Sequence, residues 1–500
     1  MSGQPLPLST GTLPRLSAGL AVPSYDRSAL QVGIVHLGVG GFHRAHQAMY
    51  LDRLMGEGKA HEWAVCGVGV LPADSGMRDA LQAQDGLYTL VEKHADGTYD
   101  ARVVGSLVEY LFAPDDPERV VERMTDPRVR IVSLTVTEGG YAVNPVTGVF
   151  LADSPDVRAD LERGAVPRTS FGLVVEALAR RRARGLPPFT VMSCDNIPGN
   201  GHVARLSFSS FARLRDPDLG AWIEREVAFP NSMVDRITPG TTEEDRAEVQ
   251  RRFGVADRWP VVCEPFAQWV LEDAFPGGRP PWEDVGVQVV TDVEPYELMK
   301  LRLLNCGHQT LGYLGYLAGH RLVHEAAQDP LFADAALGYM QREGAPTLPP
   351  VPGMDLDAYQ RQLIERFGNP QVRDTLARLC AQGTDRILTW LLPVVRHALA
   401  HDGELRLSAT VVAAWARYTE GVDEQGEPIQ LVDRLADRMT PLARRQREDP
   451  LAVLRDRESF GDLVDQPRFT DAYVAALTSL HAVGARETLV RITRETATAG

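Results

Sequence analysis

The amino-acid sequence predicts an α/β fold in which a doubly wound, largely parallel sheet at the N-terminus is followed by a mainly α-helical domain. In the first part of the chain, short apolar runs alternate with helical patterns, which is typical of strands joined by crossover helices. From about residue 295, long amphipathic segments replace this alternation. We therefore expect two domains, residues 1–291 and 292–500, with the boundary just past an apolar strand at residues 285–290.

The composition agrees with this organisation and excludes several classes of protein. At 500 residues the chain is longer than one hydrophobic core usually allows. Its 44% hydrophobic and 24% charged residues are typical of a globular protein, and no apolar run reaches the roughly 18 residues that span a bilayer. The net charge of -15 argues against nucleic acid and anionic membrane as partners.

The N-terminus and the cysteines indicate the compartment. No basic start precedes an apolar stretch, so we expect no secretion signal. The five cysteines are scattered, odd in number and without a C-x-x-C pair, which argues against a zinc site or a disulfide framework. We therefore expect a cytoplasmic protein that binds a small molecule and no metal.

The first strand is expected at residues 32–37 and runs directly into Gly38, Gly40 and Gly41, followed by a helical pattern through residue 54. In a dinucleotide-binding fold the first glycine makes a tight turn, and the second lets the backbone approach the pyrophosphate at a helix N-terminus. Gly38 and Gly40 suit these two roles. A third glycine would fall at position 43, where His43 stands, so the usual fingerprint is incomplete and a plain strand-to-helix turn is the alternative.

Four further strands are expected, at residues 63–70, 88–92, 129–136 and 189–193. An acidic residue after the second strand of such a fold accepts hydrogen bonds from the adenosine ribose, and Asp74 is the candidate. Its spacing from Gly38 is longer than the usual 20 or so residues. The alternative is a loop aspartate that caps the helix beginning near Ser75.

The C-terminal domain is expected to contain helices at residues 296–318, 354–367, 372–380, 385–400 and 451–460. The first of them carries Lys300, Asn305 and His308. At about 100° per residue, Lys300 and Asn305 lie about 140° apart with His308 between them, so all three can face one cleft. Only three lysines occur in the chain, which suggests that Lys300 is needed as a lysine.

These residue types fit the oxidation of a secondary alcohol. Such a reaction needs a base for the hydroxyl proton, and a buried lysine with a lowered pKa can be that base. The oxygen that becomes a carbonyl needs donors, which the amides of Asn305 and Asn196 can supply, the latter from the end of a strand. Asp235 offers an acidic partner. Taken singly, each residue has an ordinary alternative: Lys300 as a solvated partner of Glu297, and His308 as a core histidine.

Four motifs in order resemble those of one known family: residues 38–46, 135–141, 193–196 and 300–308. They are similar to the polyol-specific long-chain dehydrogenases, which include mannitol 2-dehydrogenases, arabinitol dehydrogenases and fructuronate reductases. The similarity extends over residues 30–480, and the family's own glycine turn continues into Phe42 and His43. The resemblance implies a Rossmann-type N-terminal domain, a mainly helical C-terminal domain and an active site between them without metal.

The resemblance also implies roles for individual residues. Lys300 would be the general base, Asn196 and Asn305 the oxyanion-hole amides, and His308 the residue that positions the substrate. Asp235 and Arg378 would bind polyol hydroxyls, Glu297 would relay protons to solvent, and Glu138 would line the same cleft. Gly38, Gly40, Gly41 and Phe42 would hold NAD, and Asp74 would favour NAD over NADP, although Ala73 stands where some members carry a second acid.

The expected function is NAD-dependent interconversion of a sugar alcohol and its 2-ketose, and mannitol and fructose are the first candidates for this pair. Fructuronate reductase (D-mannonate oxidoreductase) and arabinitol dehydrogenase are the alternatives among enzymes; the first would want an extra cation, such as Arg378 or Arg386. A nucleotide-binding regulatory protein that lost turnover is the alternative outside enzymes. Members of the family are often monomers, and the sequence itself leaves the oligomeric state open.

Overall fold

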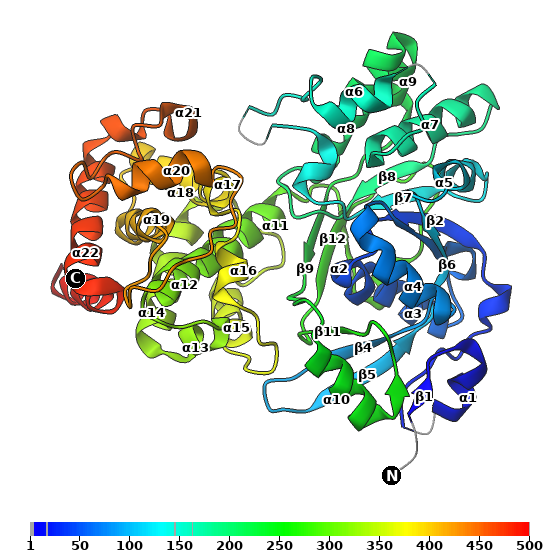
Figure 1. Ribbon diagram of the computed structural model, residues 1–500, viewed down its shortest axis with the longest axis horizontal. Helices are drawn as coiled ribbons and strands as arrows, with labels where there is room; N and C mark the ends of the chain where they lie inside the picture. Colours follow the sequence, from blue (N-terminus) through cyan, green and yellow to red (C-terminus); the bar gives the residue numbers. More distant parts are fainter. Residues whose placement is uncertain (1–4, 17–18, 145–146, 163, 500) are drawn as a thin grey trace. The chain divides into compact units, whose positions relative to one another are not determined.

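The computed structural model describes residues 5–16, 19–144, 147–162 and 164–499. The chain forms two compact units, Met1–Glu294 and Pro295–Gly500, each described by itself below (Figure 1). No helix among the described residues is long and apolar enough to cross a membrane.

The centre of the N-terminal unit is a five-stranded parallel sheet with the strand order β6-β3-β2-β7-β8. Its strands are β2 (Val32–Leu37), β3 (Ala64–Gly69), β6 (Leu107–Phe112), β7 (Ile131–Leu134) and β8 (Thr190–Ser193). The chain winds outward from β2 in one direction through β3 and β6, and then in the other through β7 and β8. This order confirms the predicted doubly wound sheet, in which the direction of winding reverses between β2 and β7.

Helices cover both faces of this sheet because strand residues point alternately to its two sides. Val35 and Leu37 pack into one apolar cluster with α5 (Pro117–Thr125), α7 (Ser170–Ala183) and α8 (Asn200–Arg215). Ile34, the residue before Val35, belongs to the other cluster, with α3 (Gln47–Gly56) and α4 (Ser75–Ala83). Because both faces are buried, the strands are largely apolar, which made them recognisable in the sequence.

A two-stranded sheet of β1 (Leu6–Pro7) and β10 (Val255–Ala256) and two three-stranded sheets complete the described part of the unit. One has the order β11-β4-β5, with β4 (Tyr88–Lys93), β5 (Tyr99–Val104) and β11 (Val261–Cys263). The other has the order β13-β12-β9, with β9 (Ser232–Asp235), β12 (Gln268–Glu272) and β13 (Gln288–Val290). The strand expected at residues 88–92 therefore exists as β4, but it lies outside the main sheet. Only five residues separate β4 from β5, which is enough for an antiparallel hairpin and too few for a crossover helix.

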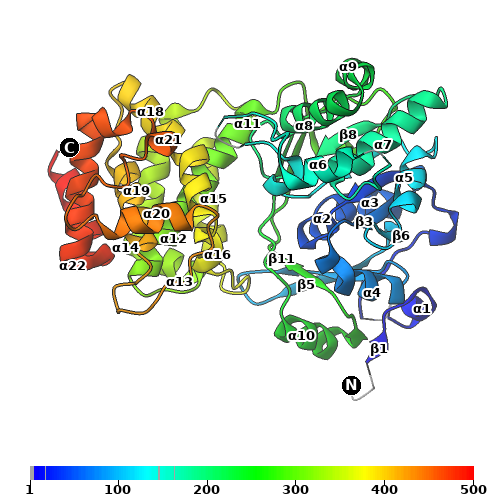
Figure 2. The same ribbon diagram turned by 45° about the horizontal axis from the view of Figure 1, so that its top comes forward.

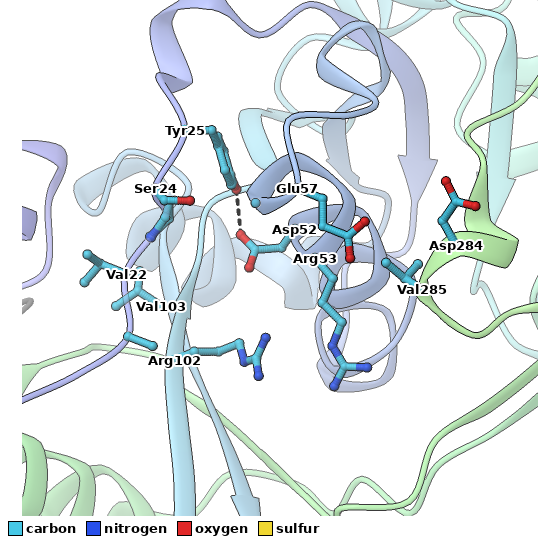
Figure 3. A pocket seen from close by; sticks show the side chains of 13 residues that line it. Val22, Ser24, Tyr25, Asp52, Arg53, Glu57, Arg102, Val103, Asp284 and Val285 are labelled. Atoms are coloured by element: carbon cyan, nitrogen blue, oxygen red, sulfur yellow. Dashed lines mark hydrogen bonds between the residues drawn. The ribbon is translucent and has the colours of Figure 1, made fainter.

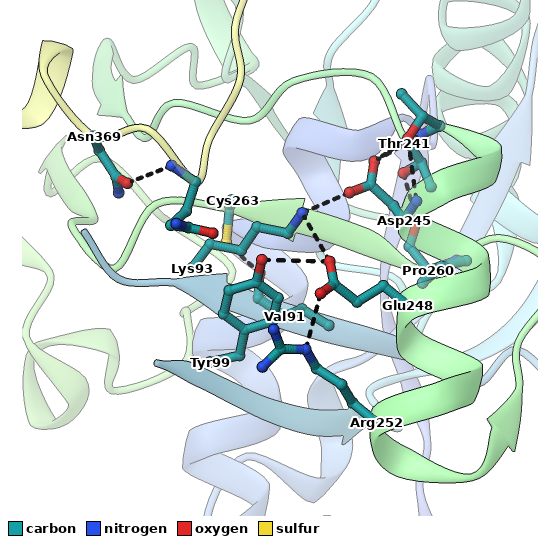
Figure 4. A network of polar contacts seen from close by, with 12 residues as sticks. Val91, Lys93, Tyr99, Thr241, Asp245, Glu248, Arg252, Pro260, Cys263 and Asn369 are labelled. Carbon is teal, nitrogen blue, oxygen red and sulfur yellow. Dashed lines mark hydrogen bonds and ion pairs between the residues drawn. The ribbon is translucent and has the colours of Figure 1, made fainter. Parts of the chain in front are cut away.

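A buried lysine fixes α10 (Glu243–Phe253) to β4 (Figure 4). The Nζ of Lys93 lies 2.6 Å from the Asp245 carboxylate, in the first turn of α10, and 3.9 Å from the Glu248 carboxylate one turn later. The Glu248 carboxylate also accepts a hydrogen bond from the Tyr99 hydroxyl of β5. The Lys93 ammonium group thus ties the helix to β4, and the Tyr99 hydroxyl ties it to β5.

The C-terminal unit consists of helices around α12 (Cys306–Leu317), in which every residue except Tyr316 is buried (Figure 2). Helices α14 (Pro330–Tyr339), α16 (Leu376–Cys380) and α19 (Arg406–Thr419) pack directly on α12. A long helical segment, α22 (Pro467–Ala499), packs on α19 and is interrupted at Gly484. The expected mainly helical character of this domain is confirmed.

Three expected helices differ in detail. Of residues 372–380 only α16 is helical, because Thr375 has an extended backbone and its side chain caps the helix at Arg378. Of residues 451–460 only α21 (Arg457–Phe460) is helical. Residues 385–400 contain a π-helical segment, Ile387–Leu391, before α18 (Leu392–Ala400), and Pro393 at the junction removes a backbone donor.

Candidate active-site residues

The glycine turn begins with a residue that no other amino acid can replace without strain. Gly38 follows β2 with a φ of +90°, and a Cβ there would lie 2.2 Å from the carbonyl oxygen of Thr135. Gly40 is the N-cap of α2 (Gly41–Ala45), and a Cβ there would meet nothing closer than 3.9 Å. Gly38 therefore lets β2 close against the end of β7, whereas Gly40 leaves its backbone open to a ligand.

Gly41 and Phe42 form the first residues of α2. A Cβ on Gly41 would make ordinary contacts, the nearest at 3.5 Å from Thr238 Cγ2, so the packing does not require glycine there. The Phe42 ring is half-buried and stacks on His46, with ring centroids 4.9 Å apart. Both residues thus stay close to the glycine turn.

His43 occupies the position of the missing third glycine and is buried. Its ring stacks on His36 of β2, with centroids 3.4 Å apart and planes 13° from parallel. The chain leaves helical geometry three residues later, at His46, with φ −126° and ψ −92°. Because α2 is only a short helix that bends here, it does not need the close helix–strand contact that the third glycine usually permits.

His36 also fixes the turn through hydrogen bonds. Its Nδ1 lies 2.8 Å from the Ser133 hydroxyl and its Nε2 2.9 Å from the Thr135 hydroxyl. The Thr135 hydroxyl in turn donates to the carbonyl of Gly38 at 2.7 Å. Burial lowers the pKa of His36 to about 3, so the ring is neutral at ordinary pH. We did not predict this network from the sequence. Its only signal there is that polar residues interrupt the otherwise apolar strands β2 and β7.

Asp195 and Asn196, the two residues that follow Cys194 after β8, differ in their surroundings. The Asp195 carboxylate accepts hydrogen bonds from the backbone N–H groups of Val136 and Thr137, at 3.1 and 2.8 Å, and from the Tyr141 hydroxyl at 2.6 Å. It therefore joins the ends of β7 and β8. Asn196, the next residue, is exposed at the carboxyl edge of the sheet, where ligands bind in folds of this type.

Three other predicted residues lie elsewhere in this unit. Asp235 is the last residue of β9 and is 4% exposed. Asp74 lies after β3, and its carboxylate accepts hydrogen bonds from the backbone N–H groups of Val70 and Leu71 at 3.0 and 2.9 Å. It is the N-cap residue of α4 but makes no side-chain cap. Glu138 begins a short helical turn, and its side chain is outside the described part of the structure.

In the C-terminal unit, Lys300 and Asn305 delimit a π-helical segment, Lys300–Asn305, between α11 (Glu294–Met299) and α12. The expected angle of 140° assumed an α-helix. A π turn closes hydrogen bonds between residues five apart, so it brings these two residues closer to one face than an α-helix would. Both are buried, with 7% and 4% exposure. Glu297, on α11, is half-buried one turn earlier.

Two polar atoms of this segment are unsatisfied. Among the described residues, neither the amide Nδ2 of Asn305 nor the ring Nε2 of His308 has a hydrogen-bond partner, although both are buried. The His308 ring lies against Phe367, with centroids 4.1 Å apart. Buried polar atoms without partners are costly, and a ligand that supplied partners here would remove that cost.

Cationic groups surround His308. Its pKa lies well below the usual value, first because the ring is buried and second because of the nearby charges of Arg378, Arg366, Lys300 and Arg386. The ring is therefore neutral, with one nitrogen that donates and one that accepts. Arg378 pairs with Asp374, Nε to Oδ1 at 2.6 Å, and Arg386 donates to the carbonyl of Leu379 at 2.8 Å. The described residues contain no group of three or more His, Cys, Asp or Glu side chains that could hold a metal ion.

Comparison with known proteins matches nearly the whole chain. Residues 32–284 match the family model described as the mannitol dehydrogenase Rossmann domain, and residues 292–481 the mannitol dehydrogenase C-terminal domain. A mannitol 2-dehydrogenase of Aspergillus fumigatus is 46% identical over 496 residues, which cover 97% of this chain and 99% of that protein. Mannitol dehydrogenase 2 of Saccharomyces cerevisiae is 46% identical over 473 residues, 94% of this chain and 93% of that one.

Two solved structures have the same fold throughout. The mannitol 2-dehydrogenase of Pseudomonas fluorescens, in a ternary complex with NAD and D-mannitol, is 42% identical with a TM-score of 0.93, covering 98% of this chain and 100% of that one. A substrate-free D-sorbitol dehydrogenase is 38% identical with a TM-score of 0.85, covering 96% and 100%.

Proposed function

This chain belongs to the mannitol dehydrogenase family, and we propose that it is an NAD-dependent dehydrogenase that interconverts a sugar alcohol and its 2-ketose, mannitol and fructose before others. The observation that carries the chemistry is the π segment with its buried lysine and its unsatisfied amide. We assign cofactor binding to residues 1–291 and the proton chemistry to residues 292–500.

The glycine turn fits NAD. Gly38 makes the tight turn, and the open backbone at Gly40 and Gly41 is available to a pyrophosphate, with Phe42 beside it. Asp74, which follows β3, would accept hydrogen bonds from a ribose. NAD, when bound, accepts the hydride from the alcohol carbon.

Lys300 is the proposed general base. The alcohol oxidation requires loss of the hydroxyl proton from the carbon that becomes a carbonyl, and an amine takes up that proton when it is itself unprotonated. Lys300 is nearly enclosed, with 7% exposure. Glu297, half-buried one turn before it, would pass the proton to solvent.

The amides and the imidazole would hold the substrate. Asn305 has an unsatisfied Nδ2 that can donate to the oxygen where negative charge develops, and Asn196 would supply the second donor. Neutral His308 can donate to or accept from one hydroxyl through its unsatisfied Nε2. Asp235 and Arg378 would bind further hydroxyls of the polyol.

The test is NADH oxidation with fructose, xylulose and fructuronate, with an NADPH control. We expect fastest turnover with fructose. In Lys300→Ala, kcat should fall by at least about 100-fold, the usual contribution of a general base, while NADH binding measured by fluorescence is retained. Added methylamine should restore part of the rate, because it replaces the missing base.

Lys300→Arg is the matched control, since it keeps a cation that does not lose its proton. It should be as inactive as Lys300→Ala and should not respond to methylamine. Full activity in Lys300→Arg would show that the charge, and not proton transfer, is what matters. No turnover of any substrate with intact NADH binding would favour a regulatory nucleotide-binding protein.

Fructuronate is the second candidate substrate because several arginines surround His308. The Arg378 charge is, however, offset by Asp374, which favours a neutral polyol. We further infer that the protein acts as a monomer in the cytoplasm. All five cysteines are buried free thiols, as in a reducing compartment, and size-exclusion chromatography with light scattering would test the oligomeric state.

A further inference from the structure

The N-terminal unit contains a pocket of about 570 Å³ that the proposed reaction does not use (Figure 3). It lies between the segment before β2, the end of α3 and β5, and its polar lining includes Tyr25, Asp52, Arg53, Glu57 and Arg102. Cavities of this size are typical of small-molecule sites.

The pocket is separate from the glycine turn. Arg53 and Glu57 lie at the last turn of α3 and just beyond it, whereas the glycine turn precedes the first turn of α2. At 1.5 Å per residue, the ten residues of α3 alone span roughly 15 Å. The pocket therefore lies toward the opposite edge of the main sheet, away from the residues to which we assign cofactor binding.

The carboxylates of the pocket already have partners. Asp52 accepts hydrogen bonds from the Tyr25 hydroxyl at 2.6 Å and from the backbone N–H of Gly105 at 2.8 Å. Burial raises the pKa of Asp52, and the nearby charges of Arg102 and Arg27 act against this shift. At the rim, Glu57 and Asp284 share the ammonium group of Lys59, at 3.0 and 2.8 Å.

Unlike these carboxylates, the guanidinium groups of Arg53 and Arg102 are not fully paired with an opposite charge. In the described part of the chain, Arg102 makes no ion pair and no side-chain hydrogen bond. Arg53 has one carboxylate within reach, Glu92 at 3.7 Å, but the same oxygen accepts from buried Arg236 at 2.5 Å. Burial and the nearby charge of Arg102 lower the pKa of Arg53. Figure 3 shows both guanidinium groups directed to the same side of the pocket.

Two adjacent guanidinium groups without a shared counter-ion match the geometry and charge of a phosphate group. We propose that this pocket is a second ligand site that binds the phosphate of a phosphorylated sugar or polyol between Arg53 and Arg102. The sugar portion would lie against Val22 and Val103, with Ser24 available to its hydroxyls. The site would act apart from the dehydrogenase chemistry, so its test does not depend on which polyol is the substrate.

The experiment is calorimetric titration of the full chain with fructose 6-phosphate in the presence of saturating NAD, which occupies the glycine turn. We expect saturable binding of one equivalent, weakened at least tenfold in Arg102→Gln, which corresponds to about 1.4 kcal/mol. Arg128→Gln is the matched control, because Arg128 is exposed and pairs only with Asp126 in the same unit. It should bind as tightly as the unmodified protein.

Inorganic phosphate and fructose distinguish the sources of the signal. If inorganic phosphate binds more weakly than fructose 6-phosphate, and its binding is also lost in Arg102→Gln, the site takes a phosphate ester. If inorganic phosphate binds as tightly as fructose 6-phosphate, the site takes free phosphate at the same two arginines. Binding of fructose alone should not change in Arg102→Gln. The proposal is overturned if fructose 6-phosphate does not bind at millimolar concentration, or if Arg102→Gln binds it unchanged. Arg102→Lys, with an unfolding midpoint measured beside it, checks that any loss is not misfolding.

Discussion

Lys300 and Asn305 are the first and last residues of a single π-helical segment. Two further π segments of the same unit, Met340–Gly344 and Ile387–Leu391, pack against it. A π turn is an α-helix widened by one residue and is frequent at functional sites. Here it places a buried amine and a buried, unsatisfied amide near one face of the helix, the arrangement that the proposed chemistry needs.

Replacing Asn305 with leucine should separate catalysis from stability. Because the Nδ2 of Asn305 has no partner among the described residues, Asn305→Leu should unfold at an unchanged or higher temperature. The kcat for fructose should fall by about 100- to 1,000-fold, the usual cost of an oxyanion-hole donor. Steady-state kinetics and thermal unfolding measure the two effects.

Gln309, on the same helix, is the control for that substitution. Its Nε2 donates to the carbonyl of Leu379, while its Oε1 has no partner among the described residues, so Gln309→Leu also removes a buried amide and should leave kcat within a few-fold. An equal loss of kcat in both variants would mean that packing of the helix, not the Asn305 amide, determines the rate.

Gly38 is required by the backbone. In Gly38→Ala the Cβ would collide with the Thr135 carbonyl in a conformation that L-residues avoid. We expect a loss of at least about 2 kcal/mol in the free energy of unfolding and at least tenfold weaker NADH binding, by urea titration and fluorescence. Gly41→Ala, where the space exists, should lose far less stability; similar losses in both would contradict the steric argument.

Asp74 should control the choice between NADH and NADPH. Its carboxylate lies after β3 and would repel a 2′-phosphate. In Asp74→Asn, which keeps an oxygen that can accept from Val70 and Leu71, kcat/KM for NADPH relative to NADH should rise at least tenfold. Asp79→Asn, an exposed change on the same helix, should leave the ratio unchanged.

The buried histidines should make stability depend on pH. The folded pKa of His36 is about 3, below the unfolded value of about 6.5. Between these two values the unfolded chain binds the extra proton, so stability rises with pH and is fully regained above about pH 6.5. Lowering the pH from 7 to 5 should cost about 2 kcal/mol for this histidine alone.

Unfolding by urea at pH 5, 6, 7 and 8 measures this slope. His36→Asn should reduce the number of protons taken up on unfolding by about one, whereas exposed His401→Asn should not. A His36→Asn slope equal to that of the unmodified protein would contradict a neutral, buried His36.

The sequence determined much of the fold because its signals were local. The apolar run of β2 and the following glycines were visible directly, since a strand buried on both faces is largely apolar. The amphipathic pattern of the segments after residue 295 likewise identified the helical domain. The residues proposed for the reaction were named from residue type and spacing, helped by the resemblance of four motifs to one family.

The tertiary structure alone decided what depends on residues far apart in the chain. The strand at β4 left the main sheet because its hairpin partner follows too closely, and the pairing of strands is non-local. The π turn between Lys300 and Asn305 follows from helix packing, which a fixed angle of 100° per residue cannot represent. The stacking of His43 on His36, and the convergence of Arg53 with Arg102, join residues that no local pattern relates. Such contacts arise from the packing of the whole unit, so they could be seen only in the folded chain.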